Sequence, residues 1–123
     1  MDDRRKSVLI VDDDPLQLRE LSDFLATMNV DCLQEQNGYG AVNSIKKNHP
    51  DLVLLDIKMP GLDGIEVARL IDNLQPKPSV ILMSGHADCV RDANSAGLHV
   101  FGIIDKPIPL RALKRFIEQK LTD

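Results

Sequence analysis

Short runs of apolar residues alternate along the chain with longer segments in which apolar residues recur every three or four positions. The short runs predict β-strands, and the periodic segments predict amphipathic helices. The predicted strands cover residues 8–11, 32–36, 52–55, 80–83 and 102–104. The predicted helices cover residues 15–28, 63–74, 88–96 and 109–121. A further helix is predicted after a turn at Asn37-Gly38; it carries Ala41, Val42 and Ile45 and ends near residue 48.

The strict alternation of strand and helix predicts an α/β fold of five βα units. Right-handed crossovers place helices on both faces of a parallel sheet, which gives three layers. Residues 52–55 are all apolar, as expected of a central strand that is buried on both faces. We expect the strand order 2-1-3-4-5, so that the first and third strands flank the point where the strand order reverses.

Polar residues follow the strands at the points where the apolar runs end. Asp12 and Asp13 follow the first strand, Asp56 the third, Ser84 the fourth and Lys106 the fifth. The carboxyl ends of parallel strands meet at one edge of a sheet, where ligands bind. Clustered carboxylates repel one another unless a cation joins them, and an oxygen-only site suits Mg²⁺, with Mn²⁺ as a second candidate.

This arrangement is suited to phosphoryl transfer, which depends on positioning and on stabilisation of charge. A metal ion and Lys106 together would offset the charge of an incoming phosphoryl group. Asp56 is the best candidate nucleophile because it ends the central strand and precedes a loop, and its reaction would give an aspartyl-phosphate.

Composition narrows the classes of function. At 123 residues the chain fits one domain, and its net charge of −4 argues against a nucleic-acid-binding surface. No apolar stretch is long enough to span a membrane, and the charged N-terminus does not resemble a signal peptide, so we expect a cytoplasmic protein. Cys32 and Cys89 lack the spacing of a redox or zinc motif.

Four motifs in order resemble the receiver domain of two-component response regulators. They are Asp12-Asp13, the segment 56–64 (Asp-Ile-Lys-Met-Pro-Gly-Leu-Asp-Gly), Ser84-Gly85 and Lys106-Pro107. The resemblance covers about residues 7–121 and implies a flavodoxin-like (βα)5 fold with the order given above. We therefore expect residues 1–123 to form a single receiver domain, either stand-alone or excised from a larger response regulator.

The resemblance implies a role for each motif residue. Asp56 would accept a phosphoryl group from a histidine kinase or phosphotransfer protein. Asp13, Asp56 and the backbone carbonyl of Lys58 would bind Mg²⁺ directly, and Asp12 would act through a coordinated water. Ser84 would donate its hydroxyl to the phosphoryl group, and Lys106 would pair with it. The Lys106–Pro107 peptide is expected to be cis. The domain would not be a classical enzyme, although slow autodephosphorylation is expected.

Other positions bear on regulation. Lys58 and His86 occupy positions that tune phosphoryl lifetime in the family. Many receivers carry Tyr or Phe where this chain has Ile103, and the nearest aromatic residue, Phe101, is expected to face the same side of its strand. The switch would then rest on Ser84 and Ile103.

The expected partners are an output domain or target protein, with the face formed by the fourth helix, fifth strand and fifth helix as one candidate surface. A homodimer is another candidate, and neither direct nucleic-acid binding nor a membrane contact is expected. A pseudo-receiver that binds partners without phosphorylation is the open alternative. A capped aspartyl phosphatase is excluded because it needs an Asp-x-Asp motif and a longer chain. A flavodoxin is excluded because three successive aspartates would repel its phosphate.

Overall fold

Five parallel strands form one sheet in the computed structural model, which describes residues 5–85 and 100–121. The strands are β1 (Ser7–Val11), β2 (Asp31–Glu35), β3 (Leu52–Asp56), β4 (Ser79–Ser84) and β5 (Gly102–Asp105). They lie in the order β2-β1-β3-β4-β5, and every neighbouring pair is parallel. The predicted fold class and strand order are confirmed.

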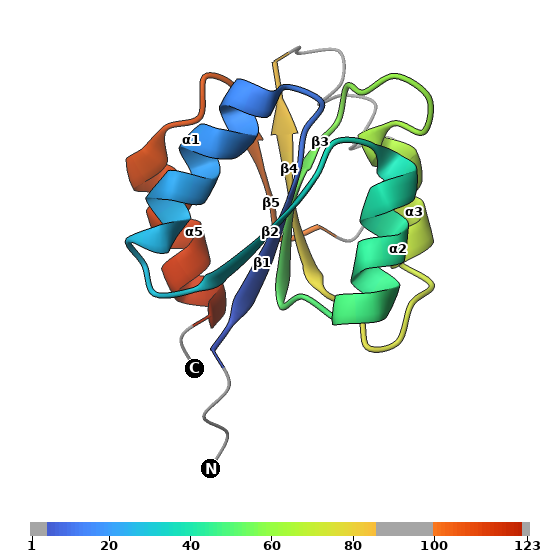
Figure 1. Cartoon of the computed structure of the whole chain (residues 1–123), viewed down its shortest axis with the longest axis horizontal. Coiled ribbons are helices and arrows are strands. Elements are labelled where there is room, and N and C mark those ends of the chain that lie inside the picture. Colours follow the sequence, from blue (N-terminus) through green and yellow to red (C-terminus); the bar gives the residue numbers. More distant parts are fainter. Residues whose placement is uncertain (1–4, 86–99, 122–123) are drawn as a thin grey trace.

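Helices cover both faces of the sheet (Figure 1). Helices α1 (Pro15–Ala26) and α5 (Leu110–Leu121) lie on one face, and α2 (Gly38–Asn48) and α3 (Gly64–Ile71) lie on the other. The helix predicted at 88–96 and the residue His86 lie outside the described residues. No helix within the described ranges has the length and hydropathy that crossing a bilayer requires.

The central strand β3 divides the core into two halves. Its side chains alternate between the faces, so Leu52 and Leu54 pack with α1 and α5, while Val53 and Leu55 pack with α2 and α3. All four are fully buried. The continuous apolar run in the sequence therefore reflects burial on both faces of the sheet.

Helices α1, α3 and α5 begin within one residue of the predicted positions, whereas α2 begins at Gly38, inside the predicted turn. Two helices end earlier than predicted. Asp14 caps α1 by accepting a hydrogen bond from the Leu16 N–H (3.0 Å), and Asp63 caps α3 in the same way. However, α1 ends at Ala26 rather than at Met28, and α3 ends at Ile71 rather than at Leu74. Met28 and Leu74 still pack against the core from the turns that follow, which is why their periodicity extended the predictions.

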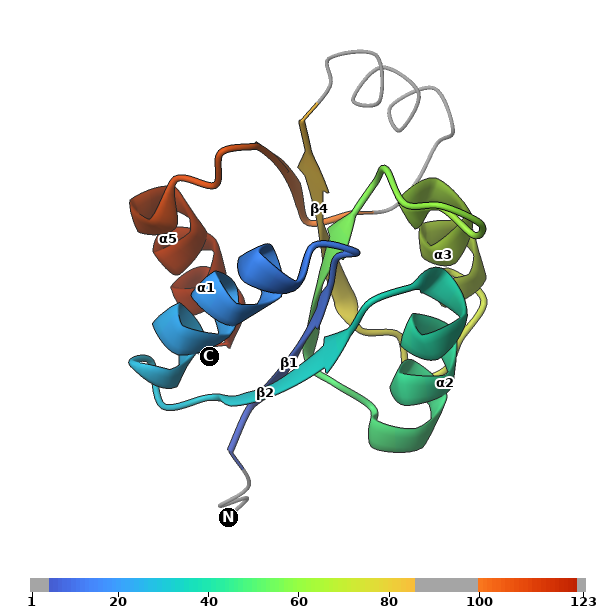
Figure 2. The same cartoon turned by 45° about the horizontal axis from the view of Figure 1, so that its top comes forward.

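The loops after β1 and β3 lie at one edge of the sheet, above the carboxyl ends of these strands (Figure 2). The loop after β3 returns toward the sheet, because the Gly64 N–H donates to the Ile57 carbonyl oxygen (2.8 Å). The neighbouring strand holds the start of the loop, since the Ile57 N–H donates to the Met83 carbonyl oxygen (3.0 Å). This segment is thus fixed at both of its ends.

Candidate functional site

The carboxyl edge of the sheet brings three aspartates together. One carboxylate oxygen from each of Asp12, Asp13 and Asp56 lies within 4.8 Å of the others. Asp12 and Asp13 follow β1, and Asp56 ends β3, its hydrogen-bonded neighbour. Asp12 and Asp56 are buried, whereas Asp13 is exposed. The predicted acidic cluster therefore forms between two adjacent strands.

Lys106 joins the two buried carboxylates. Its Nζ lies 2.9 Å from Asp12 Oδ2, to which it donates a hydrogen bond, and 3.4 Å from Asp56 Oδ2. The other oxygen of Asp12 accepts a hydrogen bond from the Asp14 N–H (3.0 Å). The Lys106–Pro107 peptide is cis, as expected, and the Lys106 N–H donates to the Ser84 carbonyl oxygen (2.6 Å). The ammonium group therefore bridges the ends of β1 and β3.

Burial and charge shift the proton affinities at this edge. Burial and the nearby Asp12 charge together raise the pKa of Asp56 to about 6, although Lys106 and the Lys58 N–H partly offset them. Burial acts to lower the pKa of Lys106, but its hydrogen bond to Asp12 and the charges of both aspartates outweigh burial and raise it. At neutral pH both groups are therefore mainly ionised, as a nucleophilic carboxylate paired with an ammonium requires.

The donor set suits a hard divalent cation. Three carboxylates against one ammonium group leave two negative charges in excess, which such an ion would balance. Mg²⁺ binds oxygen at about 2.1 Å, so opposite ligands stand about 4.2 Å apart. The three carboxylate oxygens lie within 4.8 Å of one another, which is close to this span. Residues Asp12, Asp13 and Asp56 could therefore hold Mg²⁺, with water completing its coordination.

Ser84 ends β4 beside the acidic cluster. Ser84 is buried, and it directly follows Met83, which lies opposite Asp56 in the pairing of β3 with β4. Lys58, two residues beyond Asp56, is exposed, and its N–H donates a long hydrogen bond to Asp56 Oδ1 (3.4 Å). A backbone N–H of the loop after β3 therefore helps to orient the Asp56 carboxylate.

Ile103 and Phe101 contact different helix layers, so the expectation that they face the same side is wrong. Ile103 packs partly buried against the core beneath α2 and α3. Phe101 precedes β5, and its ring meets Phe116 of α5 edge-on, with centroids 5.7 Å apart, while Lys120 Nζ lies 5.5 Å from its centroid. Because Phe101 lies outside the strand, strand alternation does not determine its direction.

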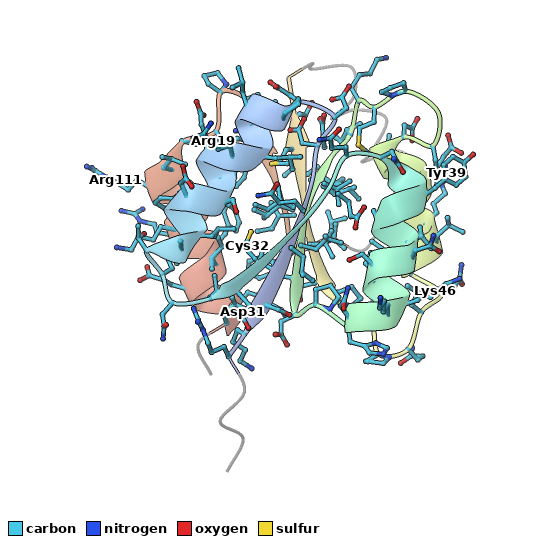
Figure 3. The ribbon with its side chains drawn as sticks, viewed as in Figure 1. Arg19, Asp31, Cys32, Tyr39, Lys46 and Arg111 are labelled. Atoms are coloured by element: carbon cyan, nitrogen blue, oxygen red, sulfur yellow. The ribbon has the colours of Figure 1, made fainter. Side chains whose placement is uncertain are left out.

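Cys32 shows no sign of reactive chemistry. It belongs to β2 (Figure 3), and its sulfur accepts a hydrogen bond from Ser22 Oγ of α1 (3.4 Å). Burial raises the pKa of the Cys32 thiol, and the Ser22 hydrogen bond only partly offsets this. Since the thiolate is the reactive form, Cys32 behaves as a packing residue. Cys89 lies outside the described residues.

Sequence reasoning did not anticipate the direct ion pair between Lys106 and Asp12. Lys106 was assigned to the phosphoryl group and Asp12 to the metal ion, because the resemblance describes a site with both the ion and the phosphoryl group bound. The signal was present in the strand order: the loop after β5 must reach past β4 and β3 to meet the end of β1. A lysine side chain cannot cross three strand spacings of about 4.8 Å each, so the loop after β5 must also carry Lys106 toward β1, and the sequence did not indicate that path.

Comparisons with known proteins agree with this geometry. The family model described as the response regulator receiver domain matches residues 8–118. The autoinducer 1 sensor kinase/phosphatase LuxN of Vibrio campbellii is 33% identical over 111 residues, covering 90% of this chain and 13% of that protein. The positive alginate biosynthesis regulatory protein of Pseudomonas aeruginosa is 35% identical over 105 residues, covering 83% of this chain and 42% of that protein.

A solved structure shows the same fold at higher coverage. The response regulator receiver domain protein (CheY-like) from Methanospirillum hungatei JF-1 has a TM-score of 0.86 and 28% identity, covering 96% of this chain and 94% of that one. The chain spans between 11% and 42% of the length of the first curated relatives, which include sensor kinases and regulators. By fold, site and sequence match, the chain belongs to the response regulator receiver domain family of two-component systems.

Proposed function

We propose that this chain is a phospho-accepting receiver domain in which Asp56 takes a phosphoryl group from a phosphohistidine of a kinase or phosphotransfer protein. Receiver domains are signalling modules rather than classical enzymes, they depend on Mg²⁺ in general, and phosphorylation-dependent switching is typical of them. The observation that carries the proposal is the buried Asp56 carboxylate, held between the Lys106 ammonium group and the other two aspartates.

The transfer exchanges one bond to phosphorus for another. An oxygen of ionised Asp56 attacks the phosphorus, the P–N bond to the donor histidine breaks, and the imidazole leaves with the electron pair and takes up a proton. The product is an acyl phosphate on Asp56. Lys106 already lies 3.4 Å from the Asp56 carboxylate, so it can pair with the phosphoryl oxygens without a large movement.

The remaining site residues have supporting roles in this proposal. Asp13, Asp56 and the backbone carbonyl of Lys58 would hold Mg²⁺, with Asp12 acting through a coordinated water. When bound, the ion would neutralise charge that develops on the phosphoryl oxygens. The Ser84 hydroxyl would donate to the phosphoryl group, and the side chains of Lys58 and His86 would adjust its lifetime through slow autodephosphorylation.

The proposal extends to the whole domain. Residues 1–123 would form one receiver domain whose conformational population shifts when Asp56 is phosphorylated, with Ser84 and Ile103 as switch positions. An output domain or target protein would read this state, with the surface of β5 and α5 as a candidate contact. Exchange with a kinase that uses ATP implies a cytoplasmic location.

The experiment that tests the function is intact-mass analysis after incubation with acetyl phosphate and Mg²⁺. We expect one adduct of about 80 Da, the mass of one phosphoryl group. It should require Mg²⁺ and be absent in Asp56→Asn. Asp105→Asn is the matched control, because Asp105 is an exposed acid next to Lys106 and its loss should leave the adduct intact.

A pseudo-receiver would behave differently in the same experiment. The folded wild-type chain would bind Mg²⁺ and give no adduct after repeated incubation. An adduct that persists in Asp56→Asn would instead assign the acceptor to another residue. Either result would contradict the proposed role of Asp56.

A further inference from the structure

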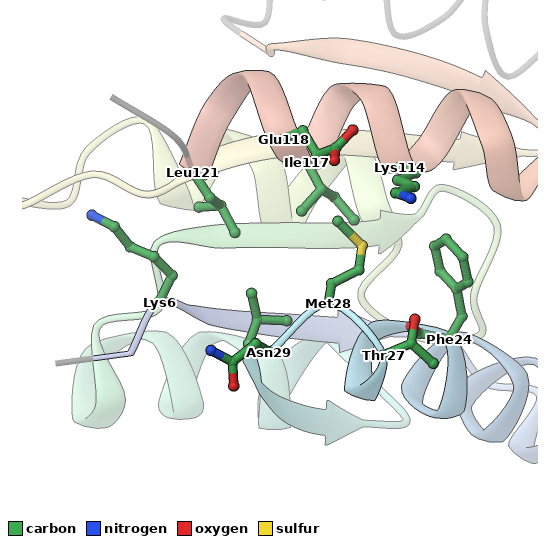
Figure 4. A pocket seen from close by; sticks show the side chains of 10 residues that line it. Lys6, Phe24, Thr27, Met28, Asn29, Lys114, Ile117, Glu118 and Leu121 are labelled. Carbon is green, nitrogen blue, oxygen red and sulfur yellow. The ribbon is translucent and has the colours of Figure 1, made fainter.

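A groove separates the C-terminal parts of α1 and α5 at the amino ends of the strands. It has a volume of about 530 Å³, and Figure 4 shows its lining side chains. Phe24 and Met28 contribute from α1 and the turn after it, and Ile117 and Leu121 contribute from α5. Lys6, just before β1, also lines the groove, so it lies at the opposite end of the strands from Asp56. The function proposed for Asp56 makes no use of this groove.

The floor of the groove is apolar and adaptable. Ile117 is buried, whereas Phe24, Met28 and Leu121 are only partly covered. Met28 has an unbranched, polarizable side chain, which lets such surfaces adjust to the shape of a partner. Asn29 adopts a left-handed conformation (φ 59°) that turns the chain toward β2 and leaves Met28 beside the opening. The floor can therefore bury a few large apolar side chains from another molecule.

The rim of the groove is basic on an acidic protein. Lys6 lines it from just before β1 and Lys114 lines it from α5, and Glu118 is the one acidic residue of the lining. Within the described residues, neither lysine has an ion-pair partner within 4.0 Å. Arg111 projects from the same helix one turn before Lys114 (Figure 3). The chain as a whole carries a net charge of −4, so it does not attract acidic partners in general. The positive charge of the rim is local and would complement acidic groups that bind at the groove.

We propose that this groove is a docking site for an acidic amphipathic helix of a partner protein. A helix fits because α1 and α5 lie side by side in one layer and a third helix can pack into the space between them. Its apolar residues at i, i+3, i+4 and i+7 would contact the floor, and flanking carboxylates would meet Lys6 and Lys114. The partner could stay bound during phosphoryl transfer, because the Asp56 edge is left free.

A second copy of this chain does not provide such a helix from its described elements. Each of the four described helices exposes a single large apolar residue: Leu16, Tyr39, Leu70 and Leu110. An apolar stripe needs three or four such residues over two turns. The occupant is therefore inferred to be a different protein.

Titration of the ¹⁵N-labelled chain with a synthetic peptide tests this inference. The probe is an amphipathic helix of about 16 residues, or roughly four turns, with leucines at i, i+3, i+4 and i+7 and glutamates on both flanks. Its twin carries lysine at every glutamate position. We expect saturable amide shifts in residues 24–30 and 114–121 with the acidic peptide, and binding at least fivefold weaker with the basic twin.

Charge reversal on the protein provides the second arm. Lys114→Glu should weaken binding of the acidic peptide by about five- to tenfold, since it replaces an attraction with a repulsion. Lys46→Glu is the matched control, because Lys46 is an exposed lysine on α2, in the other helix layer (Figure 3), and it should change nothing. Both positions are exposed, and circular dichroism verifies that each variant folds.

Four outcomes of the peptide experiments would overturn the inference. They are equal binding of the two peptides, shifts centred outside the groove, no saturable binding up to about 1 mM, and unchanged affinity in Lys114→Glu. Concentration-dependent shifts of the same amides without peptide would also overturn it, because a second copy would then occupy the groove. The peptide experiments are done without a phosphodonor, so they do not depend on Asp56.

Discussion

The ion pairs of Lys106 decide how the acidic edge behaves without a metal ion. Asp12 and Asp56 are buried, and a buried carboxylate pays a large desolvation cost unless a cation or hydrogen bonds compensate. Lys106 serves both carboxylates from one atom, at 2.9 and 3.4 Å, and cannot fully neutralise two charges. The metal-free domain therefore carries a local electrostatic cost at Asp56, which appears as its raised pKa.

We expect Asp56→Asn to stabilise the metal-free domain at neutral pH. The folded pKa of Asp56, about 6, lies above the unfolded value of about 3.9, so the ionised group destabilises the fold as pH rises through this window. Asparagine removes that cost. Urea denaturation in EDTA should show the variant gaining roughly 1–3 kcal/mol in free energy of unfolding between pH 4 and pH 7 relative to wild type.

The comparison must be made as a difference between the two proteins, because other carboxyl groups titrate in the same range. A gap between wild type and Asp56→Asn that stays constant from pH 4 to pH 7 would contradict the raised pKa. A gap that closes as pH rises would mean that folding lowers the pKa of Asp56 instead of raising it.

We expect Lys106→Met to destabilise the metal-free domain by about 3 kcal/mol, because it leaves two buried carboxylates without their shared cation. Lys58→Met is the matched control, since the Lys58 side chain is exposed and its loss should cost less than about 0.5 kcal/mol. Chemical denaturation at pH 7.5 measures both. Equal effects of the two substitutions would show that the bridge contributes nothing to stability.

At the scale of elements, the loop after β3 depends on two glycines with different physical roles. Gly64, at the start of α3, lies against the backbone of β3: a Cβ there would be 2.6 Å from Ile57 Cα and would overlap the Asp56 carbonyl oxygen. Gly61 has open space around it but a φ of 77°. One glycine permits a close approach, and the other permits a left-handed turn.

These roles predict different costs for substitution by alanine. Gly64→Ala should destabilise the domain by about 3 kcal/mol or more, because backbone atoms cannot move aside, and it should also displace Asp56. Gly61→Ala should cost only about 1 kcal/mol, the strain of a positive φ. Thermal denaturation measures the stability of both variants, and the phosphorylation assay measures their adduct. Similar losses of stability in the two variants would show that the close approach of Gly64 to the β3 backbone does not require glycine.

The elements also show what the sequence could predict. Strand positions and the acidic edge were predictable because each buried apolar run ends abruptly in a polar residue, and topology then brings these ends together. The ends of α1 and α3 were not, because Met28 and Leu74 continue the apolar period from non-helical turns. Nor was the direction of Phe101, which is set by its contact with Phe116 across the sheet edge.

At the scale of the molecule, the acidic cluster joins distant parts of the chain. Its carboxylates come from positions 12–13 and 56, which only folding brings together. A ligand that binds the folded state alone stabilises it by RT ln(1 + [L]/Kd). Binding of Mg²⁺ should therefore appear as added stability of the whole domain.

We expect Mg²⁺ to raise the melting temperature of wild type and to lose this effect in Asp13→Asn. Asp13 is exposed, so its substitution removes a candidate ligand at little cost to the fold. Its neighbour provides the control: Asp14 caps α1, and asparagine caps helices equally well, so Asp14→Asn should keep both the fold and the Mg²⁺ response. Millimolar Mg²⁺ at ten times its Kd would add about 1.4 kcal/mol. If Mg²⁺ raises the melting temperature of Asp13→Asn as much as that of wild type, Asp13 is not a ligand. If only Asp14→Asn loses this effect, Asp14 rather than Asp13 is the ligand.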